Sequence, residues 1–237
     1  MKKTAFITGA AKRIGADIAT GLAGDGYDLI LHYYRSKTEI MALKNQLENT
    51  YKVSVQTVSA NLADLTNLKQ LTPLFKNPID LLINNASCFP ERDFLNENIS
   101  SFENNFNTNF SSPLFLAQNF IKSQKKGHII NFLDCNIDKH ASLHPIYLFA
   151  KKSLGHLTHF IAATYGPHFR CNAIAPGYIL DPSDAPRTDK QRAEKFKSIP
   201  LRQQGNTKQL LSAIRYLEEQ AFVTGQTLYV DGGSRLV

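Results

Sequence analysis

The chain has 237 residues, of which 43% are hydrophobic and 20% are charged, and its formal net charge is +7. This length and composition fit one globular domain with a full hydrophobic core and exclude a disordered chain. The basic residues are scattered rather than gathered in blocks, which argues against a nucleic-acid partner and indicates a preference for small anionic molecules.

Cysteine usage and the amino-terminal stretch favour a cytoplasmic protein. Cys88, Cys135 and Cys171 are widely spaced and form no C-x-x-C pair, so we expect reduced thiols and neither disulfides nor a bound metal. The first apolar run is cut short by Lys12 and Arg13, which excludes a signal peptide. No run approaches membrane-spanning length, so no membrane partner is expected.

A first apolar strand over residues 4–8 leads through a glycine-containing turn, residues 9–15, into a helix that reaches about Ala23. Glycine in a tight turn lets the backbone approach a ligand, and free N–H groups at a helix start attract phosphate. This pattern is typical of the nucleotide-binding turn of a doubly wound sheet. Because the spacing departs from G-x-G-x-x-G, a plain strand–helix turn stays open as an alternative.

The second strand, residues 27–34, ends at Arg35 and Ser36. An acidic residue is expected near this point when the adenine ribose carries no phosphate. A guanidinium and a hydroxyl instead suit a 2′-phosphate, so NADP(H) is favoured over NAD(H). A solvated strand end is the competing interpretation.

A helix over residues 38–49 and a third strand over 53–58 follow, and then Asn61 and Leu62, where an adenine could rest. A polar helix is predicted near residues 64–75.

The fourth strand, residues 79–83, is strongly apolar and ends in small and amide residues suited to lining a cofactor groove. Phe89 stands in the polar loop that follows, where it either packs or stacks on a flat heterocycle. A long helix over residues 101–122 is predicted next, with Asn109 in its middle, either on the surface or near the cleft.

The fifth strand, from Ile129, ends at Asp134, and the next helix opens with Tyr147 and Lys151. Four residues apart on a helix, the tyrosine and the lysine share a face, with Asp134 pointing into the same cleft. The ammonium favours ionisation of the phenol, which suits a residue that donates or accepts a proton. Most Tyr-x-x-x-Lys pairs are surface contacts, so this interpretation needs a cofactor site elsewhere in the chain.

The sixth strand, residues 169–175, ends at Pro176 and Gly177. Residues 180–200 combine prolines and charges without apolar periodicity, which predicts a substrate lid loop. A helix over residues 207–218 and a strand over 226–230 close the chain. Residues 1–237 thus predict a single α/β domain, a Rossmann-type doubly wound parallel sheet with helices on both faces.

In order and spacing, five motifs resemble the short-chain dehydrogenase/reductase family from end to end. They are Thr8-Gly-x-x-x-Arg-Ile-Gly15, Asn84-Asn-Ala86, Asn109, Tyr147-x-x-x-Lys151 and Pro176-Gly177. The resemblance makes Tyr147 the general acid, with Lys151 on the nicotinamide ribose and Asn109 supporting a relay water. Arg13 replaces the usual turn glycine, and Asp134 replaces the usual serine thirteen residues before the tyrosine.

These departures narrow the resemblance to pteridine reductases and bacterial dihydromonapterin reductases. By that likeness, Arg35 and Ser36 would bind the 2′-phosphate of NADP(H), and Ser87 would contact both a cofactor phosphate and the pterin. Phe89 would sandwich the pterin against the nicotinamide, and Arg13 could reach both phosphate and the pterin carbonyl.

The resemblance therefore implies an NADPH cofactor and three sets of residues. The catalytic set is Asn109, Asp134, Tyr147 and Lys151. The cofactor-binding set is Gly9, Lys12, Arg13, Ile14, Gly15, Tyr34, Arg35, Ser36, Asn61, Leu62, Asn85, Ala86, Ser87, Tyr147, Lys151, Pro176, Gly177 and Ile179. The substrate-binding set is Arg13, Ser87, Phe89, Asp134 and Tyr147.

The implied reaction is NADPH-dependent reduction of dihydropterins of the dihydromonapterin or dihydrobiopterin type to their tetrahydro forms, with dihydrofolate as a slower substrate. A carbonyl reductase of the same family, for instance on 3-oxoacyl thioesters, is the enzyme alternative, against which Asp134 and Phe89 argue. A cofactor-binding protein without turnover is the non-enzyme alternative. The family likeness also implies a homotetramer. How Asp134, Tyr147 and Lys151 share their protons stays open.

Overall fold

The structure is a computed structural model that describes residues 2–90, 93–139, 143–182 and 186–237. Its centre is a seven-stranded sheet in the order β3-β2-β1-β4-β5-β6-β7, with every neighbouring pair parallel. The strands are β1 (Thr4–Ile7), β2 (Asp28–Tyr33), β3 (Val55–Ser59), β4 (Leu81–Asn84), β5 (Gly127–Phe132), β6 (Phe169–Pro176) and β7 (Thr227–Val230). The predicted doubly wound sheet is confirmed, and its order reverses between β1 and β4, where such folds bind ligands.

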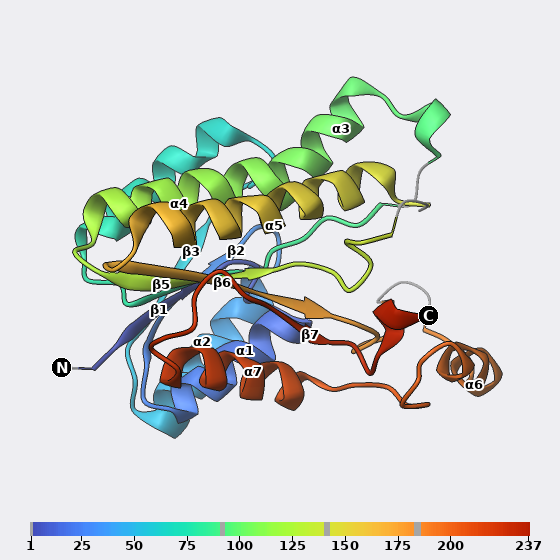
Figure 1. Ribbon diagram of the computed structural model, residues 1–237. Coiled ribbons are helices and arrows are strands. Elements are labelled where there is room, and N and C mark those ends of the chain that lie inside the picture. Colours follow the sequence, from blue (N-terminus) through green and yellow to red (C-terminus); the bar gives the residue numbers. More distant parts are fainter. Residues whose placement is uncertain (1, 91–92, 140–142, 183–185) are drawn as a thin grey trace.

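Helices cover both faces of the sheet (Figure 1). One layer holds α1 (Arg13–Gly24), α2 (Lys37–Tyr51) and α7 (Thr207–Glu219), and the other holds α3 (Ile99–Phe106), α4 (Ser112–Ser123) and α5 (Pro145–Tyr165). Successive strand residues point to opposite faces, so Ile7 packs with the first layer and Phe6 with the second. Apolar side chains pack against helices on both faces of the sheet, and polar residues lie at its carboxyl edge. No helix in the described ranges has the length and apolarity to cross a membrane.

The predicted helix over residues 64–75 is instead two 3-10 helices, η1 (Leu65–Gln70) and η2 (Thr72–Lys76). Pro73 explains the difference, because proline lacks an N–H group and its ring clashes with the preceding turn of an α-helix. Short 3-10 turns also occur at η3 (Phe94–Asn96) and η5 (Ser234–Leu236).

The predicted single helix over residues 101–122 is divided by a π-helical turn, η4 (Asn107–Ser111), between α3 and α4. The Asn109 side-chain amide donates to the Asn105 carbonyl at 3.0 Å, the carbonyl that the Asn109 backbone N–H would use in a regular α-helix. The helix therefore widens at Asn109, the residue that the family resemblance places in the active site. π-Helical turns are common at functional sites.

The predicted lid loop is wrong in part, because residues 189–197 form α6 (Asp189–Lys197). This helix begins at a capping box, in which the Thr188 side chain accepts from the Gln191 N–H and the Gln191 side chain accepts from the Thr188 N–H. It buries none of its residues, so apolar periodicity could not reveal it. Residues 183–185 of the predicted lid lie outside the described residues, as do 91–92 of the loop after β4.

Candidate active site

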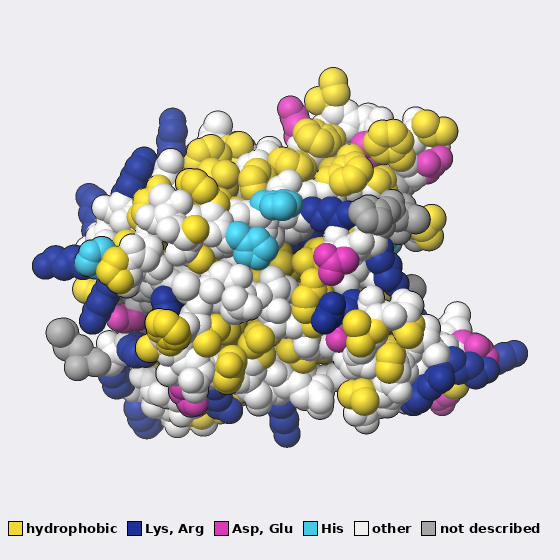
Figure 2. Space-filling view, in the orientation of Figure 1, with side chains coloured by type: hydrophobic (Ala, Val, Ile, Leu, Met, Phe, Trp, Pro, Cys, Tyr) yellow, Lys and Arg dark blue, Asp and Glu magenta, His cyan; other side chains and the backbone are white. Residues whose placement is uncertain are grey.

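Two neighbouring cavities open at the carboxyl edge of the sheet. The first, of about 630 Å³, lies over the ends of β1, β2 and β4, and the second, of about 620 Å³, lies between the ends of β5 and β6 and the helix α6. Arg13 and Ile14 line both cavities. In Figure 2 the molecule is hollowed on the side where α6 and the N-terminal end of α5 lie.

The turn between β1 and α1 needs its glycines. Gly9 has φ +64°, and a Cβ there would lie 2.9 Å from the Ala86 Cα, while a Cβ on Gly15 would overlap the Gly9 carbonyl. Arg13 also has a left-handed backbone, with φ 56°, which marks the position where the family usually has glycine. The first turn of α1 holds no acidic residue, so its N–H groups face the first cavity without a competing negative charge.

Thr8 and Asn85 join the ends of β1 and β4 beneath this turn. The Thr8 hydroxyl oxygen accepts from the backbone N–H groups of Asn85 and Ala86, each at 3.0 Å. The Asn85 amide donates to the carbonyl oxygens of Thr8 and Gly9 at 2.9 and 3.2 Å. These bonds hold the turn and the β4 end together at the floor of the first cavity.

His32 is a site residue that sequence reasoning missed. Its Nδ1 accepts from the Gly9 N–H at 3.1 Å and its Nε2 lies 3.0 Å from the Ala60 carbonyl, so the proton sits on Nε2. Burial lowers the pKa of His32 to about 4, which keeps the ring neutral and the acceptor available to Gly9. The only sequence signal is one polar residue inside an apolar strand.

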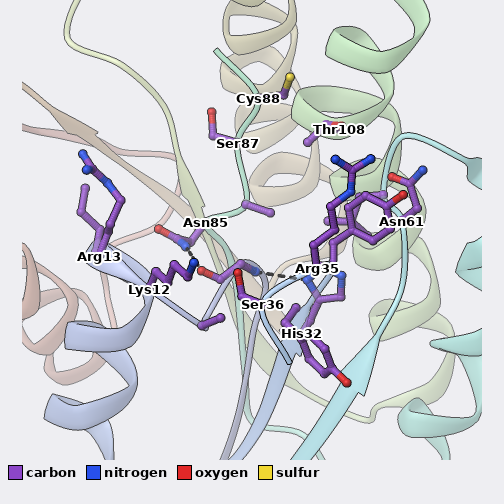
Figure 3. A pocket seen from close by; sticks show the side chains of 18 of the residues that line it. Lys12, Arg13, His32, Arg35, Ser36, Asn61, Asn85, Ser87, Cys88 and Thr108 are labelled. Carbon is purple, nitrogen blue, oxygen red and sulfur yellow. Dashed lines mark hydrogen bonds between the residues drawn. The ribbon is translucent and has the colours of Figure 1, made fainter. Parts of the chain in front are cut away.

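Arg35 and Arg13 stand at opposite ends of the first cavity (Figure 3). The Arg35 guanidinium lies 4.9 Å from the Tyr34 ring centroid and has no ion pair within the described part of the chain. Lys12, by contrast, pairs with Glu39 at 2.6 Å. The first cavity brings together the predicted cofactor residues Gly9, Lys12, Arg13, Ile14, Gly15, Tyr34, Arg35, Ser36, Asn61, Leu62, Asn85, Ala86 and Ser87.

The second cavity is lined by the predicted residues Phe89, Asp134, Pro176, Gly177 and Ile179. The predicted residues Asn109, Tyr147 and Lys151 are buried and line neither cavity. At the inner end of the second cavity the Tyr147 hydroxyl donates to Asp134 Oδ2 at 3.0 Å. Asp134 Oδ1 accepts from both the backbone N–H and the side-chain amide of Asn136, each at 2.8 Å. Three donors therefore converge on one carboxyl group at the edge of the cavity.

The groups around Tyr147 disfavour its ionisation, a question that the sequence left open between the opposing effects of Lys151 and Asp134. Burial first, and then the charge and hydrogen bond of Asp134, raise the pKa of Tyr147 well above its ordinary value, while the Ser87 hydroxyl acts the other way. The Lys151 ammonium donates to the Phe132 carbonyl at 2.7 Å and lies 5.7 Å from the Tyr147 ring centroid. Burial lowers the pKa of Lys151 to about 8. Tyr147 thus keeps its proton at neutral pH.

Phe89 lines the second cavity, and 55% of its surface is exposed. Its ring meets the Tyr147 ring edge-on at 4.5 Å and stacks on His144 at 3.8 Å. His144 Nδ1 lies 2.9 Å from the Pro90 carbonyl, which orients the imidazole. His144 was not predicted, and its place three residues before Tyr147 is the only signal for it.

Asn109 is fully buried and fastens the segment after β4. Its amide donates to the Cys88 carbonyl at 2.7 Å, and its oxygen accepts from the Ser87 hydroxyl at 2.9 Å. Ser87 lines the first cavity and not the second, so the structure places it on the predicted cofactor side. Within the described residues, no group of three His, Cys, Asp or Glu side chains is arranged to hold a metal ion.

Known proteins match this chain almost end to end. The family model described as Enoyl-(Acyl carrier protein) reductase matches residues 9–235. The crystal structure of FolM alternative dihydrofolate reductase 1 from Brucella canis, complexed with NADP, matches with a TM-score of 0.89 and 28% identity, over 99% of this chain and 95% of that one.

Two curated relatives are similar in sequence over nearly the whole chain. The 7alpha-hydroxysteroid dehydrogenase of Bacteroides fragilis is 30% identical, over 98% of this chain and 93% of its own length. The 3-oxoacyl-[acyl-carrier-protein] reductase FabG of Staphylococcus epidermidis is 25% identical, over 98% and 99%. The names of these relatives point to different substrates.

Proposed function

Because this chain belongs to the short-chain dehydrogenase/reductase family of oxidoreductases, we propose that it reduces dihydropterins with NADPH. The observation that carries the proposal is the Tyr147–Asp134 hydrogen bond at the edge of a cavity that Phe89 also lines. Asp134 and Phe89 are the residues by which the chain resembles pteridine reductases rather than carbonyl reductases. The likeness to an alternative dihydrofolate reductase complexed with NADP supports it independently.

The first cavity fits NADPH. Gly9 leaves room where a Cβ would meet Ala86, and α1 turns its N-terminal N–H groups toward the cavity, as a pyrophosphate requires. Arg35, with Ser36 beside it, offers a guanidinium without an ion pair in the described ranges, which suits a 2′-phosphate. NADPH supplies a hydride when bound.

Tyr147 supplies the proton in this reaction. Reduction of a C=N bond adds a hydride at carbon and a proton at nitrogen, and the raised pKa of Tyr147 keeps that proton on the phenol at neutral pH. The hydroxyl now donates to Asp134, so a pterin nitrogen at the cavity edge would compete with the carboxylate for the same proton. After Tyr147 has given up its proton, Asp134 holds the Tyr147 ring in position and transfers a proton from solvent to the phenolate. Phe89 offers an exposed ring face to a flat heterocycle.

A carbonyl reductase acting on 3-oxoacyl thioesters is the second candidate, because the FabG relative covers nearly the whole chain. Tyr147 and Lys151 would serve it equally well. Asp134, in place of a serine that hydrogen-bonds a carbonyl oxygen, disfavours it, because a carboxylate repels the negative charge that develops there.

The test follows loss of the reduced nicotinamide absorbance against dihydromonapterin, dihydrobiopterin, dihydrofolate and an acetoacetyl thioester, each with NADPH and with NADH. We expect rapid turnover of a dihydropterin with NADPH. Turnover of the thioester alone would overturn the proposal in favour of a carbonyl reductase, and equal rates with NADH would overturn the assignment of Arg35. Tight NADPH binding without turnover of any substrate would point to a cofactor-binding protein.

A further inference from the structure

The outer wall of the second cavity is basic. Apart from Arg13, which it shares with the first cavity, it is lined by Lys139, Arg187, Lys195, Lys197 and Arg202. Asp134 is the only acidic side chain that lines it within the described ranges, and it lies at the inner end beside Tyr147. Figure 2 shows Lys and Arg side chains at the walls of this hollow.

Two of these cations, Lys139 and Lys195, have neither a carboxylate nor a carbonyl partner for their side chains among the described residues. Arg187 pairs with Asp181 at 3.5 Å, Lys197 pairs with Glu194 at 2.6 Å, and the Arg202 guanidinium donates to the Lys197 carbonyl. The ammonium groups of Lys139 and Lys195 form no such pair in the part of the chain that the structure describes.

The acidic groups nearby are already engaged elsewhere. The Asp231 carboxylate accepts from the backbone N–H groups of Gly233 and Arg235, each at 2.9 Å. The Asp138 carboxylate accepts from the Tyr229 hydroxyl at 2.8 Å, and Asp181 accepts from Arg192 Nε at 2.9 Å as well as from the Tyr178 hydroxyl. These bonds leave Lys139 and Lys195 as positive charges facing the cavity.

Lys139 and Lys195 belong to different segments of the chain, but both lie at the second cavity, near Cys135. Lys139 follows β5 and Lys195 lies on α6, and both line the cavity. Burial and the charge of Asp134 raise the pKa of the Cys135 thiol to about 12, and the two lysines act against that rise. Both ammonium groups are therefore within electrostatic reach of the residue next to Asp134.

We infer that Lys139 and Lys195 bind a negatively charged tail on the pterin side chain, so that anionic dihydropterins are the preferred substrates. This inference rests on the proposed function and names the substrate class of the same site. A cavity of about 620 Å³ falls in the range that holds a drug-sized ligand, so it has room for a tail beyond the ring. Carboxylates of a glutamyl tail and a phosphate ester share the required chemistry.

The experiment compares substrates with the same ring and different tails. Dihydropteroate, dihydrofolate and its triglutamate form a series of increasing carboxylate number, and dihydromonapterin and its phosphate ester form a second pair. The readout is the ratio of kcat/KM between the anionic and the less charged member of each series. We expect each added charge to raise kcat/KM about two- to fivefold at low salt, less at high salt. The series with the larger ratio identifies carboxylate or phosphate as the tail.

The variant Lys139→Gln/Lys195→Gln should bring these ratios close to one, while Lys190→Gln on the same helix is the matched control, since Lys190 lines neither cavity. Ratios near one in the unmodified protein, or ratios that survive in the double variant, would overturn the inference and leave pterin reduction intact. Failure to reduce any pterin, with turnover of a thioester on an acidic carrier protein, would overturn the proposed function itself.

Discussion

Two tyrosines donate hydrogen bonds to carboxylates at opposite edges of the sheet. At the amino edge, the Tyr27 hydroxyl donates to Glu218 at 2.7 Å, and at the carboxyl edge the Tyr147 hydroxyl donates to Asp134 at 3.0 Å. Burial is the largest cause that raises the pKa of each phenol, and the neighbouring carboxylate adds to it. The two pairs are thus built from the same groups.

Their surroundings differ. Glu218 also lies 2.6 Å from His128, 3.3 Å from Lys3 and 3.9 Å from Arg170. Burial raises the pKa of Glu218, but its hydrogen bonds with His128 and Tyr27 and the charges of His128 and Lys3 lower it to about 2. Asp134 has hydrogen bonds from Asn136 and Tyr147 and faces a cavity, while the Lys151 ammonium is bound to a backbone carbonyl. We therefore expect the enclosed pair to contribute to stability, and the pair whose carboxylate lines a cavity to serve the proposed proton transfer.

The largest expected effect that separates the two pairs is on turnover. Removal of the hydroxyl in Tyr147→Phe should lower kcat about 10²- to 10⁴-fold, because the proton donor is lost. NADPH binding, measured by fluorescence titration, should change little. The matched variant Tyr27→Phe should keep its turnover. Loss of cofactor binding together with turnover in Tyr147→Phe would make Tyr147 a structural residue.

The second largest expected effect is a loss of stability when the tyrosine–carboxylate pair at the amino edge is disrupted. Glu218→Gln removes the charge that His128, Lys3 and Arg170 surround, which should lower the free energy of unfolding by about 2–3 kcal/mol. Turnover of the folded variant should not change. Urea unfolding measures the loss, with Glu219→Gln, an exposed neighbour, as the control expected to stay within about 0.5 kcal/mol. Equal losses in the two variants would show that the enclosed pair contributes nothing.

The stability of the protein should fall in two successive pH windows. The unfolded chain binds a proton at His32 below about pH 6.5, whereas the folded protein does so only near pH 4, so stability should fall as the pH drops through this window. His128, whose pKa burial also lowers, adds to the same fall. Glu218 contributes stability above pH 4.5 that is lost as the pH falls toward 2. Each group gives a slope of at most about 1.4 kcal/mol per pH unit.

Urea unfolding at successive pH values checks this, and Glu218→Gln should flatten the part of the curve below pH 4.5. A wild-type curve that is level between pH 6.5 and 4 would contradict the buried neutral state of His32.

The smallest expected effect concerns the stack beside the second cavity. His144→Ala should free the Phe89 ring and raise the KM for a dihydropterin about two- to fivefold, with kcat little changed. His144→Phe keeps a flat ring against Phe89 and should restore most of the affinity. If it fails to do so, the bond to the Pro90 carbonyl, rather than the stack, positions the loop.

Sequence patterns predicted most of the sheet because buried parallel strands carry long apolar runs that end at polar residues. The ends of these apolar runs also predicted that Asn85 and Asp134 lie at the carboxyl edge of the sheet, near Tyr147 at the start of the following helix. What the patterns missed depends on single side-chain bonds: the amide of Asn109 that widens a helix, the ring nitrogen of His32 that holds Gly9, and the cap at Thr188 that starts α6. The raised pKa of Tyr147 depends on burial and on the charge and hydrogen bond of Asp134, none of which a four-residue spacing reveals.

Arg13 shows a conflict between what the fold prefers and what the site needs. Its left-handed backbone, with φ 56°, would cost glycine little but costs a side chain on the order of 1 kcal/mol. Random mutation to glycine would relax the turn and yet remove the cation shared by both cavities. The stability of the turn and the positive charge of the two cavities therefore make opposite demands on this one position, and Arg13→Gly should make the protein more stable while it removes that charge.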